Sequence, residues 1–385
     1  MTPGARIAAA ITVLDQIGAG AAPEQALTRW ARASRFAGSK DRAAIRDHVF
    51  DVLRNWRSDA ALGGGETGRA RMIGRLRAEG ALLEDFFSGA GHAPAPLSAA
   101  ERNAGRAPDG VGEAWNLPDW LVPDWQASLG SGAHNAAMFA MSRAPITVRA
   151  RGDVAAVQTA LAGEGIRADL NPRAAQALTI IEGARQLRQS RVWTEGRIEL
   201  QDASSQAIVE DIAGRGAALD YCAGGGGKAL ALSDRGWRVT AHDADPKRMA
   251  DLPARAARTG QKIDISVQPR GRFDLVLCDA PCSGSGAWRR APQGKWSLTP
   301  DRLADLTLLQ DTVLDAALPY VADGGVLVFA TCSVLAAENE ARVDAFLARH
   351  SGWTVLRQKR WPIDALGDGF FVAHLSAKPT SATQL

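Results

Sequence analysis

Two cysteines in the C-terminal half follow apolar stretches of similar design. Phe273–Asp279 runs into Ala-Pro-Cys282, and Val326–Ala330 runs into Thr-Cys332-Ser. A cysteine just beyond a strand, in a loop of small polar residues, is well placed to act as a nucleophile in its thiolate form. The alternative is that such a cysteine is a small apolar residue of the core. We favour this interpretation only for Cys278, which lies within its strand.

A glycine loop precedes these cysteines. It reads Cys222-Ala223-Gly224-Gly225-Gly226-Gly227-Lys228 and leads from a predicted strand into a predicted helix. Consecutive glycines let the backbone turn tightly and approach a ligand closely. A Walker A loop is excluded because Cys222 replaces its first glycine and Ala229 replaces the Ser or Thr that holds magnesium. A dinucleotide fingerprint fits better, since Gly224, Gly226 and Ala229 match G-x-G-x-x-A.

An acidic residue completes the pattern of a nucleoside site. Asp243 directly follows the predicted strand Arg238–His242, where a carboxylate accepts hydrogen bonds from ribose hydroxyls. The alternative is a helix-capping role, which Asp245 would fill equally well. The loop and Asp243 together predict a nucleoside cofactor without saying which one.

The two cysteines suggest a specific reaction if their strands are neighbours. Cys282 and Cys332 would then emerge side by side over the cofactor. Carbon 5 of cytosine is not nucleophilic by itself, but addition of a thiolate to carbon 6 makes it able to attack a methylsulfonium. These residues alone do not say which cysteine attacks.

Alternating strands and helices place these motifs at one edge of a sheet. From about residue 198 the pattern predicts a doubly wound α/β sheet, whose ligands bind beyond the carboxyl ends of the strands. The predicted strands are Ala218–Cys222, Arg238–His242, Ile263–Val267, Phe273–Cys278, Gly325–Ala330, Trp353–Leu356 and Phe370–Leu375, with helices at Thr299–Val321 and Ala336–Arg349.

Two further domains are predicted before the sheet, which gives ranges of 1–114, 115–197 and 198–385. The first is helical, with segments at Ile7–Ile17, Pro23–Arg35, Ser39–Trp56 (Ser39 as N-cap) and Arg69–Phe87, followed by a linker. The second is a small α+β domain, with strands at Ile146–Ala150, Ile166–Leu170 and Leu178–Ile181 and a helix at Val154–Ala162.

Charge and composition narrow the possible partners. The chain has 385 residues and a net charge of +3, and residues 1–80 carry 13 Lys and Arg against 8 Asp and Glu, a balance of +5. Such a surface suits phosphate, although a solvated arginine-rich helix face would look the same. The expected RNA contacts there are Arg32, Arg35, Lys40, Arg42 and Arg46.

Several classes of protein are disfavoured. The four cysteines form no CxxC pair and the six histidines are scattered, so neither a disulfide framework nor a metal site is expected. No apolar run is long enough to span a bilayer, and no signal peptide is recognised, so the cytoplasm is the expected location. We expect a monomer.

The motifs together resemble those of the RsmB/Nop/Sun family of RNA 5-methylcytosine methyltransferases. Besides the glycine loop, Asp243 and the two cysteine loops, the resemblance covers Gln201–Gln206, Glu338-Asn-Glu340 and Asp368-Gly-Phe-Phe371. The N-terminal segment from Lys40 to Arg54 resembles the NusB-like domain of the bacterial branch. The resemblance implies a Rossmann-like S-adenosylmethionine-dependent domain preceded by an all-helical NusB-like domain and a small α+β connecting domain.

The resemblance also implies roles. Cys332 would be the nucleophile and Cys282 would assist product release. Asp279 would be a polar partner of base and cofactor, and Lys228 would hold the cofactor end of the site. The segment from Trp288 to Trp296 would face the substrate, with Arg289, Arg290 and Lys295 as phosphate contacts. The implied cofactor is S-adenosyl-L-methionine, and the implied substrate is small-subunit ribosomal RNA.

The sequence departs from the family pattern at two places. The cofactor loop has glycine where many members have proline. The segment Val267-Gln-Pro-Arg-Gly-Arg272 also lacks the acidic residue expected near the adenine.

Two other functions remain as alternatives. An NAD(P)-dependent dehydrogenase accounts for the glycine loop and Asp243 but leaves both cysteine loops unexplained. A non-catalytic RNA-binding assembly factor accounts for the fold but not for the intact cysteine pair.

Overall fold

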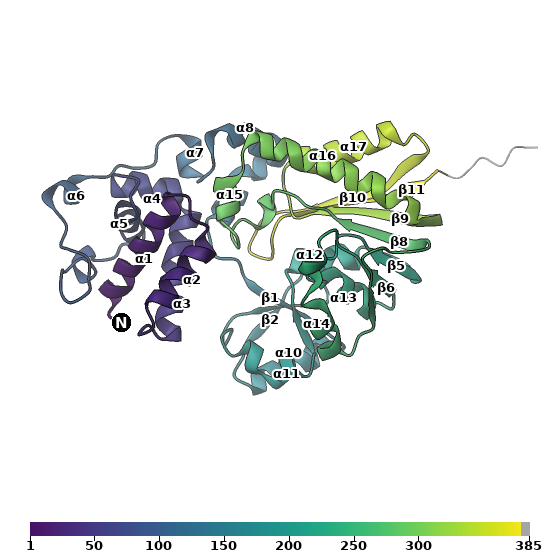
Figure 1. Cartoon of the computed structure of the whole chain (residues 1–385), viewed down its shortest axis with the longest axis horizontal. Helices are drawn as coiled ribbons and strands as arrows, with labels where there is room; N and C mark the ends of the chain where they lie inside the picture. The colour runs from purple at the N-terminus through teal and green to yellow at the C-terminus, as the bar shows by residue number, and fades with distance from the viewer. Residues whose placement is uncertain (379–385) are drawn as a thin grey trace, which may run out of the picture. The chain divides into compact units, whose positions relative to one another are not determined.

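The computed structural model describes residues 1–378 (Figure 1). Contacts divide the chain into two compact units. The first contains Met1–Gln126, Ala133–Arg143 and Trp288–Leu298, and the second contains Ala127–Gly132, Ala144–Ala287 and Thr299 onward.

The first unit is helical and has its own core. Buried side chains that include Ile7, Leu14, Ile45, Val49 and Met72 pack together between its helices. The helices are α1 (Pro3–Gly18), α2 (Pro23–Ala33), α3 (Ser39–Arg54), α4 (Trp56–Gly63), α5 (Gly68–Ala78), α6 (Ala99–Asn103), α7 (Gly110–Ala114), α9 (Ala133–Ala140) and α15 (Gln293–Ser297), together with the first part of α8 (Val122–Leu129), whose last three residues belong to the second unit.

The helical pattern was predicted well in its apolar spacing and less well at its ends. Ser39 is the first residue of α3, and Gly38 is its N-cap, so the expected capping role of Ser39 is wrong. Asn55 interrupts the expected helix, and α4 follows as a separate helix. The fourth expected helix ends at Ala78, before Gly80 with φ 68°, a left-handed conformation that favours glycine.

The second unit contains two sheets. The smaller is antiparallel in the order β2-β3-β1-β4, and α10 (Val154–Gly163) and α11 (Arg191–Thr194) belong to this region. Its strands are β1 (Ile146–Ala150), β2 (Ala168–Leu170), β3 (Ala177–Ile180) and β4 (Ile198–Leu200). The smaller sheet thus extends into Ile198–Leu200, which the sequence pattern assigns to the next domain.

The larger sheet has seven strands in the order β10-β11-β9-β8-β5-β6-β7. Five neighbouring strands in this order, namely β9, β8, β5, β6 and β7, are parallel. Strand β11 pairs antiparallel with β9, and β10 pairs antiparallel with β11. The strands are β5 (Ala217–Asp220), β6 (Arg238–Ala241), β7 (Ile263–Ile265), β8 (Phe273–Asp279), β9 (Val321–Thr331), β10 (Trp353–Trp361) and β11 (Phe370–Ala377).

Helices cover both faces of this sheet (Figure 1). One face packs against α12 (Ala203–Glu210), α13 (Gly227–Asp234) and α14 (Leu252–Thr259), and the other against α16 (Pro300–Ala317) and α17 (Glu340–Arg349). Alternate strand residues therefore enter different cores: Leu275 and Leu277 enter one, Val276 and Cys278 the other. The expected doubly wound α/β fold is confirmed.

Candidate functional site

The glycine loop begins at the carboxyl end of β5 and is shaped by Asp243. One carboxylate oxygen of Asp243 accepts a hydrogen bond from the Gly224 main-chain N–H at 2.9 Å, and the other accepts from the Asp245 N–H at 3.0 Å. Asp243 is buried and also pairs with Arg248 at 3.1 Å. Its carboxylate therefore holds the loop, and contact with a ribose remains a prediction.

Gly226 is the position in this loop that most clearly requires glycine. Its φ is 79°, and a Cβ there would lie 2.3 Å from Cδ1 of Leu252. A side chain at this position would therefore displace Leu252, so glycine is needed for the tight turn into α13.

Lys228 and Asp279 form an ion pair beneath the cysteine loops, with Nζ 2.6 Å from Oδ2. Burial alone would lower the pKa of Lys228, but Asp279, and then Cys332 and Asp220, outweigh burial and raise it. Lys228 is thus held as a buried cation with three acidic neighbours.

Asp220 is a third acid of the site, at the end of β5. It is 1% exposed, and burial followed by the charge of Asp279 raises its pKa to about 7. Apart from a weak interaction with the main-chain N–H of Ala229, neither carboxylate oxygen has a hydrogen-bond partner. An acid buried in this way is suited to a cationic ligand group, because an unmatched buried acceptor is costly.

The expected cysteine pair is formed. Strands β8 and β9 are parallel neighbours with Asp279 opposite Ala330, and the Sγ atoms of Cys282 and Cys332 lie 3.4 Å apart. The main-chain N–H of Gly286 donates to the carbonyl of Cys332 at 2.9 Å, which joins the two loops. Cys278 is fully buried in the core, as its place within the strand predicts.

Glu338 clamps both cysteine loops. Its carboxylate accepts hydrogen bonds from the Ser283 N–H at 2.7 Å, from the Ser333 hydroxyl at 2.5 Å and from the Gln310 amide at 3.2 Å. Ser283 follows Cys282 and Ser333 follows Cys332. One fully buried carboxylate therefore fixes the residue after each cysteine.

Asn339 holds the same loop from the other side. Its side-chain oxygen accepts from the Thr331 hydroxyl at 2.5 Å, and its amide donates to the Ser333 carbonyl at 3.0 Å. Thr331 and Ser333 flank Cys332. Glu338 and Asn339 therefore act through the main chain and hydroxyls around the thiols, whereas Glu340 pairs with Arg360.

The two thiols have different electrostatic neighbours. The Lys228 cation interacts favourably with a Cys332 thiolate. The hydrogen bond with Cys332, followed by burial and then by charges that include Glu338, raises the pKa of Cys282 well above its ordinary value. Cys282 is therefore held as a thiol. Burial also raises the pKa of the Cys222 thiol in the cofactor loop.

Two other motifs meet behind the cysteines. The main-chain N–H of Gly369 donates to the Gly286 carbonyl at 3.0 Å, and a Cβ on Gly286 would lie 2.0 Å from the Gly369 oxygen. The Asp368 N–H donates to Asp202, which also caps α12. These contacts give Gly286, Gly369 and Asp202 a structural role, although their motifs are far apart in the sequence.

The first unit presents a basic surface on α2, α3 and the turn between them. Arg32, Arg35, Lys40, Arg42 and Arg46 are all exposed. Arg46 pairs with Glu24, and the Arg42 guanidinium donates to the Ala37 carbonyl. The five residues are accessible to phosphate, and their RNA contact remains a prediction.

Two other expected RNA contacts require correction. Lys295 is fully buried, and its Nζ donates to the Arg54 carbonyl at 3.3 Å. Burial, and then the Arg54 charge, lower the pKa of Lys295 to about 7. Arg289 is 1% exposed, and its carbonyl accepts from Arg54 at 2.7 Å. Neither side chain is accessible to a phosphate, whereas Arg290 is exposed.

Sequence reasoning missed Asp220 and gave no role to Glu338. Asp220 lies within the apolar strand that precedes the glycine loop, and an acid at the end of a buried strand is the signal that would have found it. The partners of Glu338 come from three separate segments, so spacing along the chain carries no comparable signal.

Residues 1–378 contain neither a cluster of metal-ligating side chains nor a helix that could span a membrane. No group of three or more His, Cys, Asp or Glu side chains there is arranged to hold a metal ion. Within that range, every helix is too short or too polar to cross a membrane.

Comparison with known proteins gives a consistent result. Residues 210–376 match the family described as 16S rRNA methyltransferase RsmB/F. Ribosomal RNA small subunit methyltransferase B of Erwinia tasmaniensis is 34% identical over 239 residues, which cover 56% of this chain and 55% of that protein. The chain spans about half the length of the curated relatives it matches.

Solved structures show the same fold. The crystal structure of PH0851 aligns with a TM-score of 0.76 at 22% identity, covering 98% of this chain and 99% of that one. A methyltransferase homologue from Pyrococcus horikoshii aligns with a TM-score of 0.59 at 20% identity, covering 69% and 97%. At these identities the likeness establishes the fold alone.

Proposed function

We propose that the chain is a member of the RsmB/Nop/Sun family of methyltransferases and that it methylates carbon 5 of a cytosine in RNA, with S-adenosylmethionine as methyl donor. The observation that carries this proposal is the pair of thiols 3.4 Å apart at the ends of neighbouring parallel strands, next to a buried Lys–Asp ion pair.

The residues beyond the strands fit the cofactor. Asp243 and the glycine loop suit its ribose, and the unmatched carboxylate of Asp220 suits its amino group. Ile265 and Val267, 42% and 62% exposed at the end of β7, offer the adenine an apolar surface in place of the missing acid. The bound cofactor supplies an electrophilic methyl carbon.

Cys332 is the proposed nucleophile. Its thiolate, favoured by Lys228, forms a bond from Sγ to carbon 6 of cytosine, and the electron pair of the 5,6 double bond moves to carbon 5. That electron pair would form the bond to the methyl group, and the bond between the methyl group and the cofactor's sulfur would break, which leaves S-adenosylhomocysteine. Asp279, held by Lys228, faces the base and accepts hydrogen bonds from its polar groups.

Cys282 is the proposed release residue. After methyl transfer, carbon 5 still carries its original proton, and the Sγ–carbon 6 bond must break. Transfer of that proton to the Cys282 thiolate restores the double bond and expels the Cys332 thiolate. Cys282 can lose its own proton at this stage because Cys332, once bonded to carbon 6, no longer raises the Cys282 pKa. Cys282, 3.4 Å from Cys332, is close enough to take part in this elimination.

Small-subunit ribosomal RNA is the proposed substrate, because curated relatives that the chain matches carry that name. The test is incubation of the protein with a small-subunit RNA transcript and S-adenosylmethionine, followed by nucleoside mass spectrometry. We expect 5-methylcytidine at one position, and none with a Cys332→Ala variant. Methylation at another atom, or binding of NAD in preference to S-adenosylmethionine, would contradict the proposal.

A further inference from the structure

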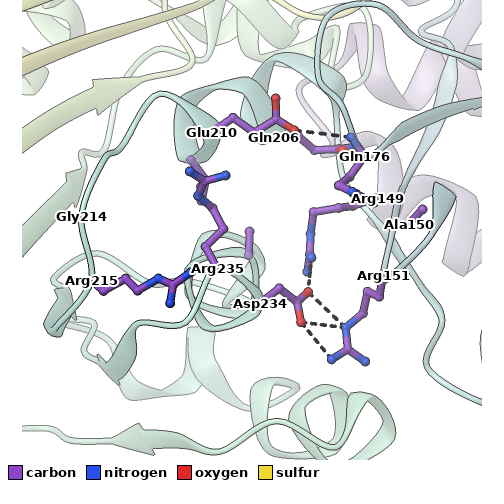
Figure 2. Close-up of a pocket in the computed structure, with 13 residues that line it drawn as sticks. Arg149, Ala150, Arg151, Gln176, Gln206, Glu210, Gly214, Arg215, Asp234 and Arg235 are labelled. Atoms are coloured by element: carbon purple, nitrogen blue, oxygen red, sulfur yellow. Dashed lines mark hydrogen bonds and ion pairs between the residues drawn. The ribbon is translucent and has the colours of Figure 1, made fainter.

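A second pocket lies in the second unit, away from the cysteine loops. It has a volume of about 530 Å³ and is lined by the end of β1, by α12, by the turn before β5 and by the last turn of α13. Figure 2 shows Arg149, Arg215 and Arg235 around it, with Asp234 at its edge. None of its lining residues belongs to the glycine loop or to the cysteine loops.

The pocket has an excess of positive charge. Four arginines line it (Arg149, Arg151, Arg215 and Arg235) against two acids (Asp234 and Glu210), which leaves +2. Asp234 already pairs with both Arg149 and Arg151. Glu210 accepts from the main-chain N–H groups of Ala175 and Gln176. Neither acid therefore neutralises the remaining two arginines.

Arg215 and Arg235 are free to bind an anion. Both are exposed, and neither forms an ion pair with a carboxylate among residues 1–378. Arg235 makes a single long hydrogen bond of 3.4 Å to the Ile212 carbonyl. A guanidinium with its donors open matches the oxygens of a phosphate.

Two buried polar atoms of the lining residues lack partners. Arg149 is 5% exposed, and its Nη2 has no hydrogen-bond partner, although Nε donates to Gln201 and Nη1 pairs with Asp234. Gln206 is 1% exposed, and its Oε1 has no partner either. An unmatched donor and an unmatched acceptor in one pocket point to a ligand that carries both an anion and a hydroxyl.

We propose that this pocket binds a ribose–phosphate unit of the RNA strand, with the phosphate on the arginines and a ribose hydroxyl on Gln206. This inference rests on the proposed function for its choice of RNA. A free nucleotide presents the same chemistry, and the experiment below distinguishes the two sources.

The probe is an RNA pentamer of 4-thiouridine and uridine, which contains no cytosine that the catalytic site could use. The full-length protein is crosslinked to it by light, and the crosslinked peptides are mapped by mass spectrometry. The test variant is Arg215→Glu/Arg235→Glu. The control variant is Arg185→Glu/Lys262→Glu, which changes the charge equally at exposed positions outside the pocket. Unchanged S-adenosylhomocysteine binding verifies the fold of each variant.

We expect crosslinks on peptides that line the pocket, reduced about tenfold or more in the test variant and little changed in the control. Uridine monophosphate at micromolar concentration should not compete if the source is a strand, and should compete if it is a free nucleotide. Crosslinks only outside the pocket, or an equal reduction in both variants, would overturn the proposal. If the wild type makes no 5-methylcytidine yet retains the pocket crosslink, the proposed function fails and the pocket stands.

Discussion

At the scale of single residues, the site consists of two thiols made unequal by their neighbours. Both cysteines lie in the same kind of loop, so the sequence alone does not indicate which of them is the nucleophile. Lys228 lies near Cys332, whereas the hydrogen bond with Cys332, then burial, and then charges that include Glu338 raise the pKa of Cys282. Both neighbours are distant in sequence from the thiol they affect, so spacing could not predict the asymmetry.

Glu338 provides a prediction at this scale. Glu338→Gln keeps one acceptor oxygen for the Ser283 N–H, and the serine hydroxyls can rotate to accept from its amide, so the loops should stay in place. The negative charge is lost, which lowers the pKa of the Cys282 thiol. We expect Cys282 to react with iodoacetamide at lower pH than in the wild type, as measured by mass spectrometry across a pH series.

The matched variant is Glu338→Ala, which removes the clamp as well as the charge. Its methyl transfer should fall about a hundredfold, because small displacements of reacting groups are costly, while Glu338→Gln retains most of it. Identical pH profiles of Cys282 alkylation in wild type and Glu338→Gln would show that Glu338 does not act through charge.

At the scale of elements, the sheet was predicted from the sequence and the close helix pair was not. Apolar strands that end in polar loops indicated a parallel sheet, and β8 and β9 are neighbours as expected. By contrast, α4 and α5 approach through glycines: a Cβ on Gly63 would lie 1.7 Å from the Ala70 oxygen. Glycine in a sequence usually indicates the end of a helix. The glycines that permit this close contact are therefore the reason why α4 was not predicted.

Asp59 lies in this helix pair and makes stability depend on pH. It is 1% exposed, both carboxylate oxygens lack hydrogen bonds, and Arg75 lies 3.7 Å away. Burial raises the pKa of Asp59 to about 8 from 3.8. Between these two values the folded state holds a proton that the unfolded state has lost, so folding becomes less favourable as pH rises.

We therefore expect Asp59→Asn to be more stable than the wild type at pH 8, with a smaller difference at pH 5. The slope for this group is at most about 1.4 kcal/mol per pH unit. Urea unfolding of the two proteins at both pH values measures it. A difference that does not grow with pH would mean that Asp59 is ionised with little penalty.

At the scale of the whole molecule, the segment Trp288–Leu298 links the catalytic loop to the helical unit. It begins six residues after Cys282, yet it packs in the first unit, where Trp288 stacks on Trp125 at 6.0 Å and Trp296 donates to the Leu53 carbonyl at 2.7 Å. Its cationic and aromatic composition suggested RNA contact, but tertiary packing uses the same side chains internally. Composition alone cannot distinguish these two uses.

The motifs predicted from the sequence therefore depend on contacts that no local pattern reveals. The glycine loop, Asp243 and the cysteine loops were found because each follows a strand. The clamp by Glu338, the burial of Lys295 and the arginine pocket depend on residues brought together only by the fold.

The central claim is that Cys332 attacks the base and Cys282 releases it. The direct measurement is a denaturing gel of Cys332→Ala and Cys282→Ala after incubation with target RNA and S-adenosylmethionine. We predict a protein–RNA adduct that survives SDS for Cys282→Ala, because attack and methyl transfer proceed while elimination stalls, and no adduct for Cys332→Ala. A stable adduct from Cys332→Ala with none from Cys282→Ala would contradict the account and reverse the two roles.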